Sequence, residues 1–216
     1  MGTALHFVRA GGMMMIPLTI CSILALAIII EKAYTLRTRR VIAPEIVGVI
    51  ENMGGREDVI ASIAVCQRVN SPFARVIESS LSKHRLPRAD NVELTQATAR
   101  QEVGALERGL LMLEIITGIS PLLGLLGTVL GIFHVFNVIV DRGVGEASVL
   151  SGGISEALIT TIVGLFIAIP ALVAHSYYSK RVDELVLEIE RYANTLTHKL
   201  YSSETEPAGE TVSVKR

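Results

Sequence analysis

The apolar stretch at residues 149–178 reads VLSGGISEALITTIVGLFIAIPALVAHSYY. It is longer than the roughly 20 residues that an apolar helix needs to cross the hydrocarbon core of a bilayer. Glu156 is the one carboxylate in this stretch, which contains no Lys or Arg. Residues 149–178 therefore predict a membrane-spanning helix that carries a single acidic side chain.

Two further segments, 13–30 and 115–138, contain no charged residue apart from histidine. They explain why the chain is 50% hydrophobic and only 19% charged, against about 25% charged in ordinary soluble domains. The apolar core of 13–30 exceeds the roughly 7–15 residues of a secretory signal, so we interpret it as a retained membrane anchor. This composition excludes a simple soluble enzyme, a nucleic-acid binder and a disordered protein.

Basic residues indicate the orientation of the three predicted spans. The sides that follow spans 13–30 and 149–178 carry most of them: Lys32, Arg37, Arg39, Arg40, Lys180 and Arg181. The other side offers only Arg9 and Arg142. Cytoplasmic loops are the ones enriched in Lys and Arg. The N-terminal residues 1–12 and the loop 139–148 are therefore expected outside, and residues 31–114 and 179–201 in the cytoplasm.

The cytoplasmic segments are predicted to be helical, which makes the fold class an all-α membrane protein with a cytoplasmic helical bundle. Pro44 and the pair Ser71-Pro72 are typical of helix starts, and Asp58 is expected to cap a helix over 59–69. Apolar positions repeat from Ala99 to Leu113 and predict a helix running directly into span 115–138. A similar repeat continues span 149–178 as an amphipathic helix over 179–201. The tail, 202–216, is expected to be disordered, and Cys21 and Cys66 to remain unpaired.

Glu156 is the strongest candidate for chemistry. An ionisable group at membrane depth is costly and usually faces a partner, a cavity or an ion path. The alternative is that Glu156 lies near the outer interface and is simply hydrated. At 100° per residue, Thr160 lies about 40° around the helix from Glu156 and Thr161 about 140°. Thr160 could therefore bond the carboxyl, whereas Thr161 would face a neighbouring helix; both could instead bond their own backbone.

Span 115–138 carries a row of small residues spaced by four, three and four: Ser120, Gly124, Gly127 and Gly131. Such a face lets membrane helices approach closely, so these glycines are predicted to pack helices. Thr128 adds a polar side chain deep in this span, and Pro170 is expected to kink span 149–178. The sequence contains no phosphate loop, no metal-ligand spacing and no catalytic triad. It therefore predicts no enzyme and no cofactor.

Two motifs resemble the MotA/TolQ/ExbB proton-channel family. They are GLLGTVLGIF at 124–133 and GISEALITTIVGLFIAIPA at 153–171. The flagellar branch of that family has an additional span, so the likeness favours the ExbB/TolQ branch. The resemblance implies a homopentameric ring in the bacterial inner membrane with periplasmic N-termini. It also places Glu156, Thr128 and Thr161 on a proton path, with Thr160 as a secondary candidate.

The resemblance further implies partners. An ExbD/TolR-type dimer of single-span chains would occupy the central pore and carry the transferable proton, so that protons are the coupling ion. The work would pass to a TonB-type transducer for outer-membrane import. The alternatives are a TolQ-like subunit working with a TolA-type protein, a passive membrane scaffold, and a small-solute transporter, for which the sequence lacks the usual inverted repeat.

Overall fold

The computed structural model describes residues 12–54, 58–142 and 147–202, with the side chains of 141–150 left aside. These residues form helices and no strand, so the all-α prediction is confirmed for the described part of the chain. The expectations for the N-terminal residues 1–11 and for the tail after residue 202 lie outside it. The chain divides into two compact units.

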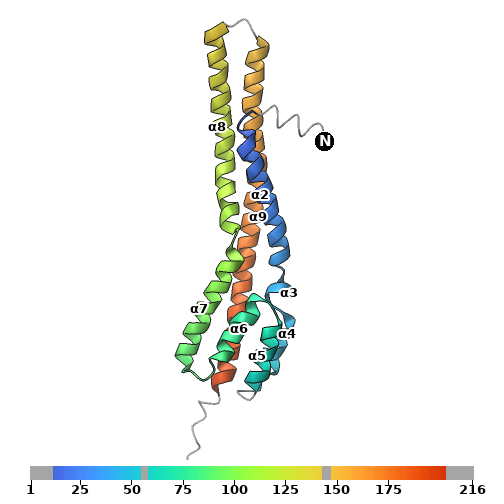
Figure 1. Cartoon of the computed structure of the whole chain (residues 1–216), viewed down its shortest axis with the longest axis vertical. Coiled ribbons are helices and arrows are strands. Elements are labelled where there is room, and N and C mark those ends of the chain that lie inside the picture. Colours follow the sequence, from blue (N-terminus) through green and yellow to red (C-terminus); the bar gives the residue numbers. More distant parts are fainter. Residues whose placement is uncertain (1–11, 55–57, 143–146, 203–216) are drawn as a thin grey trace, which may run out of the picture. The chain divides into compact units, whose positions relative to one another are not determined.

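The first unit contains the chain up to Tyr34 together with Gly109–Ser179. Its helices are α2 (Met15–Thr35), α8 (Leu110–Arg142) and the first part of α9 (Ala147–Tyr201), which run side by side in Figure 1. All three are long and apolar enough to cross a membrane. Their shared core contains residues from each helix: Ala25, Leu113, Ile116 and Ala171. The Tyr178 hydroxyl also donates to the Ile29 carbonyl over 3.1 Å, which ties α9 to α2.

The outward faces of these three helices are apolar. Large side chains stay exposed on each of them, including Ile16 and Ile23 on α2, Leu122 on α8, and Phe166 and Leu172 on α9. A soluble monomer rarely exposes so large an apolar surface. Lipid or other membrane helices therefore suit these faces better than water does.

The second unit contains Thr35–Arg108 and the chain from Lys180 onward. Its helices are α3 (Thr38–Val41), α4 (Pro44–Asn52), α5 (Val59–Arg68), α6 (Pro72–Ser82), α7 (Arg88–Glu107) and the remainder of α9. Helices α4 to α7 pack in chain order, each against the next, at α4·α5, α5·α6 and α6·α7.

The helix starts of the second unit follow the sequence signals with one exception. Pro44 occupies the first turn of α4, and the Ser71 hydroxyl accepts a hydrogen bond from the Ala74 amide over 3.1 Å at the start of α6. Asp58 stands at the N-cap position of α5, as predicted, but its side chain makes no cap bond. Its carboxylate accepts instead from the Gly54 amide over 3.0 Å, closing the turn between α4 and α5.

A buried polar network stabilises the end of α9 in the second unit. The Asn91 side chain, fully buried, donates to the Ser80 carbonyl and to the Tyr201 hydroxyl, each over 3.0 Å. Its oxygen accepts from the hydroxyls of Ser80 and Thr95. The Tyr201 hydroxyl in turn donates to the Leu86 carbonyl over 2.8 Å. Buried polar groups that are fully satisfied in this way rigidify a core.

The predicted continuity into span 115–138 is wrong, because α7 ends at Glu107 and α8 begins at Leu110. Between them Gly109 adopts φ +92°, a conformation open to glycine because it has no Cβ. By contrast, α9 continues without a break to Tyr201 although Pro170 lies inside it, as the apolar repeat over 179–201 predicts. Cys21 and Cys66 are both free thiols.

Candidate functional site

Glu156 lies on α9, half-buried, against the start of α2. A Cβ built on Gly12 would overlap the Glu156 carboxylate oxygen Oε1 and lie 2.9 Å from its carboxyl carbon. The carboxylate therefore rests directly on the backbone of Gly12. No pattern in the sequence indicates this contact, since Gly12 directly precedes the span 13–30 whereas Glu156 lies in the span 149–178.

Thr160 packs against α8 instead of reaching Glu156. Its side chain is 1% exposed, and its hydroxyl donates to the Ala157 carbonyl over 2.7 Å. A Cβ on Gly127 would overlap the Thr160 hydroxyl oxygen and lie 2.7 Å from the Thr160 Cβ. The Thr160 hydroxyl therefore bonds the backbone of its own helix and not the Glu156 carboxyl.

Thr161 joins the two helices. Its hydroxyl donates to the Gly124 carbonyl on α8 over 3.0 Å. A Cβ on Gly124 would lie 3.0 Å from the Thr161 Cα and from the Thr160 carbonyl oxygen. The missing side chain of Gly124 therefore brings the two backbones close enough for this bond. Within one chain, Thr160 and Thr161 both face α8.

The contact between α8 and α9 extends along both helices. A Cβ on Gly131 would lie 2.9 Å from the Ala157 Cβ, and one on Gly164 would lie 2.5 Å from the Ser120 carbonyl oxygen. Sequence reasoning missed the α9 side of this contact. Its members, at positions 153, 157, 160 and 164, repeat the four, three, four spacing of the small residues on α8. This matching spacing is the pattern in the sequence that could have indicated the contact.

Thr128 and Pro170 stand apart from this contact. The Thr128 hydroxyl donates to the Leu125 carbonyl of its own helix over 2.6 Å. One residue of helix turns it about 100° from Gly127, and its side chain is partly exposed. Pro170 lies within α9 beyond the group of threonines. The described chain therefore brings together Glu156 with Gly12, and Thr160 and Thr161 with the glycines, but not Thr128.

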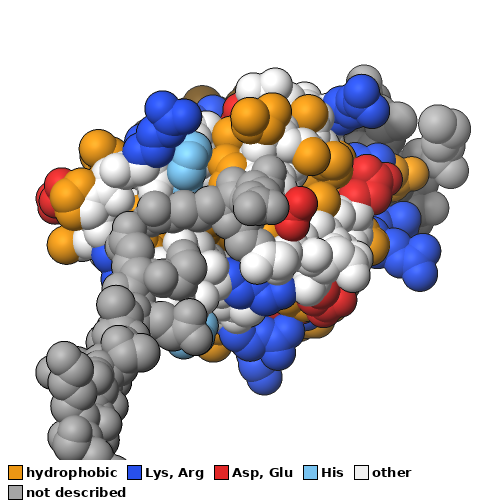
Figure 2. Space-filling view, turned by 90° about the horizontal axis from the view of Figure 1, so that it is seen from below, with side chains coloured by type: hydrophobic (Ala, Val, Ile, Leu, Met, Phe, Trp, Pro, Cys, Tyr) orange, Lys and Arg blue, Asp and Glu red, His pale blue; other side chains and the backbone are white. Residues whose placement is uncertain are grey.

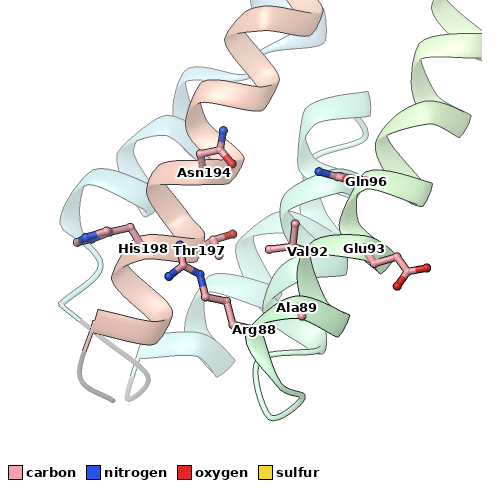
Figure 3. A pocket seen from close by; sticks show the side chains of 8 residues that line it. All are labelled: Arg88, Ala89, Val92, Glu93, Gln96, Asn194, Thr197 and His198. Carbon is pink, nitrogen blue, oxygen red and sulfur yellow. The ribbon is translucent and has the colours of Figure 1, made fainter. Parts of the chain in front are cut away.

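The second unit contains an open hollow on its surface. It measures about 910 Å³ and lies between α7, with Arg88, Val92 and Glu93, and the end of α9, with Thr197 and His198 (Figure 3). Among the described residues, no cluster of His, Cys, Asp and Glu could hold a metal ion. Figure 2, a view of the molecule from below, shows Lys and Arg mixed with Asp and Glu on the visible face, without one continuous basic patch.

Three helices that are long and apolar enough to cross a membrane, two of them joined by a tight contact of small residues, are the architecture of a helical membrane protein. The model of the MotA/TolQ/ExbB proton channel family matches residues 68–191. This match covers more than half of the chain, which therefore belongs to that family. The family is one of membrane proton channels and not of enzymes.

Curated relatives agree with this assignment. An ExbB-like protein of Synechocystis is 36% identical over 171 residues, which cover 76% of this chain and 79% of the relative. An ExbB homolog of Methanothermobacter thermautotrophicus is 29% identical over 191 residues, 88% of this chain and 67% of the relative. A Tol-Pal system protein TolQ of Haemophilus influenzae is 35% identical over 101 residues, 47% of this chain and 44% of the relative.

Proposed function

We propose that this chain is the ExbB-like ring subunit of a proton-driven motor in a bacterial inner membrane. In this proposal five copies surround a dimer of ExbD-type single-span chains, and a TonB-type protein carries the work to outer-membrane import. Protons are the coupling ion, and neither a cofactor nor nucleic acid takes part. The observation that supports this proposal most is Glu156. It is the one charged residue in an apolar stretch of α9, in a chain that belongs to a family of proton channels.

The proposed topology follows the distribution of basic residues. Residues 1–12 and 139–148 lie in the periplasm, 13–30, 115–138 and 149–178 cross the bilayer, and 31–114 and 179–201 lie in the cytoplasm. The exposed apolar side chains of α2, α8 and α9 support a ring whose subunits share these faces with lipid and with each other.

The proposed proton path uses Glu156 with Thr161 and Thr128, and Thr160 in a secondary role. The Thr161 hydroxyl donates its hydrogen to the Gly124 carbonyl. Its oxygen can still accept a hydrogen bond from water or from a proton carrier. Thr128 lies on another face of α8, where it suits contact with the central partner or a neighbouring copy better than contact with Glu156.

The test is proton flux through the complex purified with its single-span partner and reconstituted in vesicles carrying a pH-sensitive dye. Glu156→Gln combined with Thr128→Ala should abolish proton flux, while Glu45→Gln, which removes an exposed carboxylate from α4, should not change it. Unchanged flux in an assembled Glu156→Gln, Thr128→Ala complex would refute the proton path and favour the passive scaffold.

A TolQ-like role is the second candidate, because the Haemophilus TolQ matches nearly half of the chain. Relatives named for ExbB align over larger shares of this chain, which favours the ExbB-like role. Deleting the gene separates the two: loss of energised outer-membrane uptake supports the ExbB-like role, whereas uptake that persists beside defective envelope constriction supports the TolQ-like role.

A further inference from the structure

Gly12 has a backbone conformation and a contact that both favour glycine. Its φ of +62° lies in the left-handed region, which glycine adopts readily because it has no Cβ. Independently, a Cβ at this position would overlap Glu156 Oε1, 2.9 Å from the Glu156 Cδ and 3.6 Å from its Cγ. No longer side chain fits at residue 12 while the Glu156 carboxylate keeps its place.

The contact lies where α2 starts. The Gly12 carbonyl accepts from the Met15 amide over 3.1 Å, and the Met13 carbonyl from the Ile16 amide over 3.3 Å. Negative charge is favoured at the N-terminal end of a helix, and the Glu156 carboxylate lies at that end of α2, a helix other than α8 or α9.

We infer that Gly12 is a positioning residue for Glu156: by lacking a side chain, it lets the start of α2 hold the carboxylate on the proton path. This inference rests on the proposed function. It adds α2 to a path otherwise assigned to α8 and α9. A change at residue 12 would then act through Glu156 without itself exchanging a proton.

The placement can be tested without any flux measurement. Gly12→Cys and Glu156→Cys are combined in a chain in which Cys21 and Cys66 are alanine, and the full complex is oxidised in membranes with copper phenanthroline. The expected product is a disulfide within one chain, visible by mass spectrometry as the loss of two hydrogens. Ile154→Cys, about 160° around α9 from Glu156, replaces Glu156→Cys as the matched control and should not pair. Equal yields for both pairs, or no disulfide with Glu156→Cys, would overturn the inference.

The role can be tested by flux with a compensating substitution. Gly12→Ala should lower proton flux on the order of tenfold, as small displacements of reacting groups do, in complexes whose assembly native mass spectrometry verifies. Gly152→Ala is the control, because a Cβ there meets nothing within 4 Å. Glu156→Asp withdraws the carboxylate by one carbon bond, about 1.5 Å. Gly12→Ala with Glu156→Asp should therefore conduct better than Gly12→Ala alone.

The outcomes separate the inference from the proposed function. If Glu156→Gln abolishes flux but Gly12→Ala matches Gly152→Ala, the positioning role of Gly12 is wrong and the proton path stands. If the double variant conducts no better than Gly12→Ala, overlap with the carboxylate is not the cause, and the inference is wrong. If the disulfide forms but Glu156→Gln conducts like the unchanged chain, the proton path is wrong.

Discussion

Replacing Gly127 by alanine tests the contact between α8 and α9 directly. The new Cβ would overlap the Thr160 hydroxyl oxygen and lie 2.7 Å and 3.1 Å from the Thr160 Cβ and Cγ2. Carbon atoms in contact stay about 3.5–4.0 Å apart, so the two helices must separate by several tenths of an ångström or more. That movement also stretches the nearby hydrogen bond from Thr161 to Gly124, now 3.0 Å long.

The size of the effect follows from two opposed contributions. Overpacking a tight contact costs about 1–3 kcal/mol, and the helix preference of alanine over glycine returns up to about 1 kcal/mol. We therefore expect Gly127→Ala to lower the free energy of unfolding by up to about 2 kcal/mol. Gly118→Ala on the same helix is the matched control, because a Cβ there meets nothing within 4 Å, and it should be neutral or slightly stabilising.

The assay is reversible unfolding of the purified chain in mixed detergent micelles, followed by circular dichroism. Thr160→Gly removes all three atoms that the new Cβ would strike, so Gly127→Ala should destabilise the Thr160→Gly background much less than the unchanged chain. This double-mutant cycle isolates the interaction between the two positions. Strictly additive effects, or equal stability of Gly127→Ala and Gly118→Ala, would refute the packing argument.

Three further predictions concern the second unit. Asn91→Leu leaves the Ser80 carbonyl and the Tyr201 hydroxyl without this partner, so local opening of α6 and α7 should become about 2–3 kcal/mol easier, measured by hydrogen exchange; unchanged protection would contradict this. Lys199→Met removes the hydrogen bonds to the carbonyls of residues 50, 51 and 53 at the end of α4. Local opening of α4 should then become about 1 kcal/mol easier and its hydrogen exchange faster, whereas exchange at the rate of the unchanged chain would argue against this cap. Burial, with Glu78 adding a smaller effect, raises the pKa of the Cys66 thiol from 9.0 to about 11. Because the raised pKa favours the protonated thiol in the folded state, the free energy of unfolding should fall by up to about 3 kcal/mol as the pH rises from below 9 to above 11. Cys66→Ala should lack this loss, and an equal pH dependence of the two proteins would exclude it.

Local signals in the sequence predicted much of the helix pattern. Uncharged apolar runs located α2, α8 and α9, and Ser71-Pro72 marked the start of α6 because capping depends on neighbours along the chain. The break at Gly109 was missed because the apolar repeat from Ala99 to Leu113 continues across it. Asp58 stands at the start of α5, but its carboxylate accepts from the Gly54 amide instead of capping that helix. Residue type alone does not tell which of these two local partners the carboxylate bonds.

For the candidate site, residue types and spacings are enough to show which residues are unusual: one carboxylate in an apolar stretch, threonines beside it, and a face of small residues on another span. The tertiary structure decided which of them meet. Thr161 bonds Gly124, and Glu156 rests on Gly12. Thr160 lies only about 40° around the helix from Glu156, yet it packs against Gly127. The physical reason is that helical periodicity fixes angles within one helix, whereas contacts between helices depend on their rotation and register, which the packing of all three helices sets together.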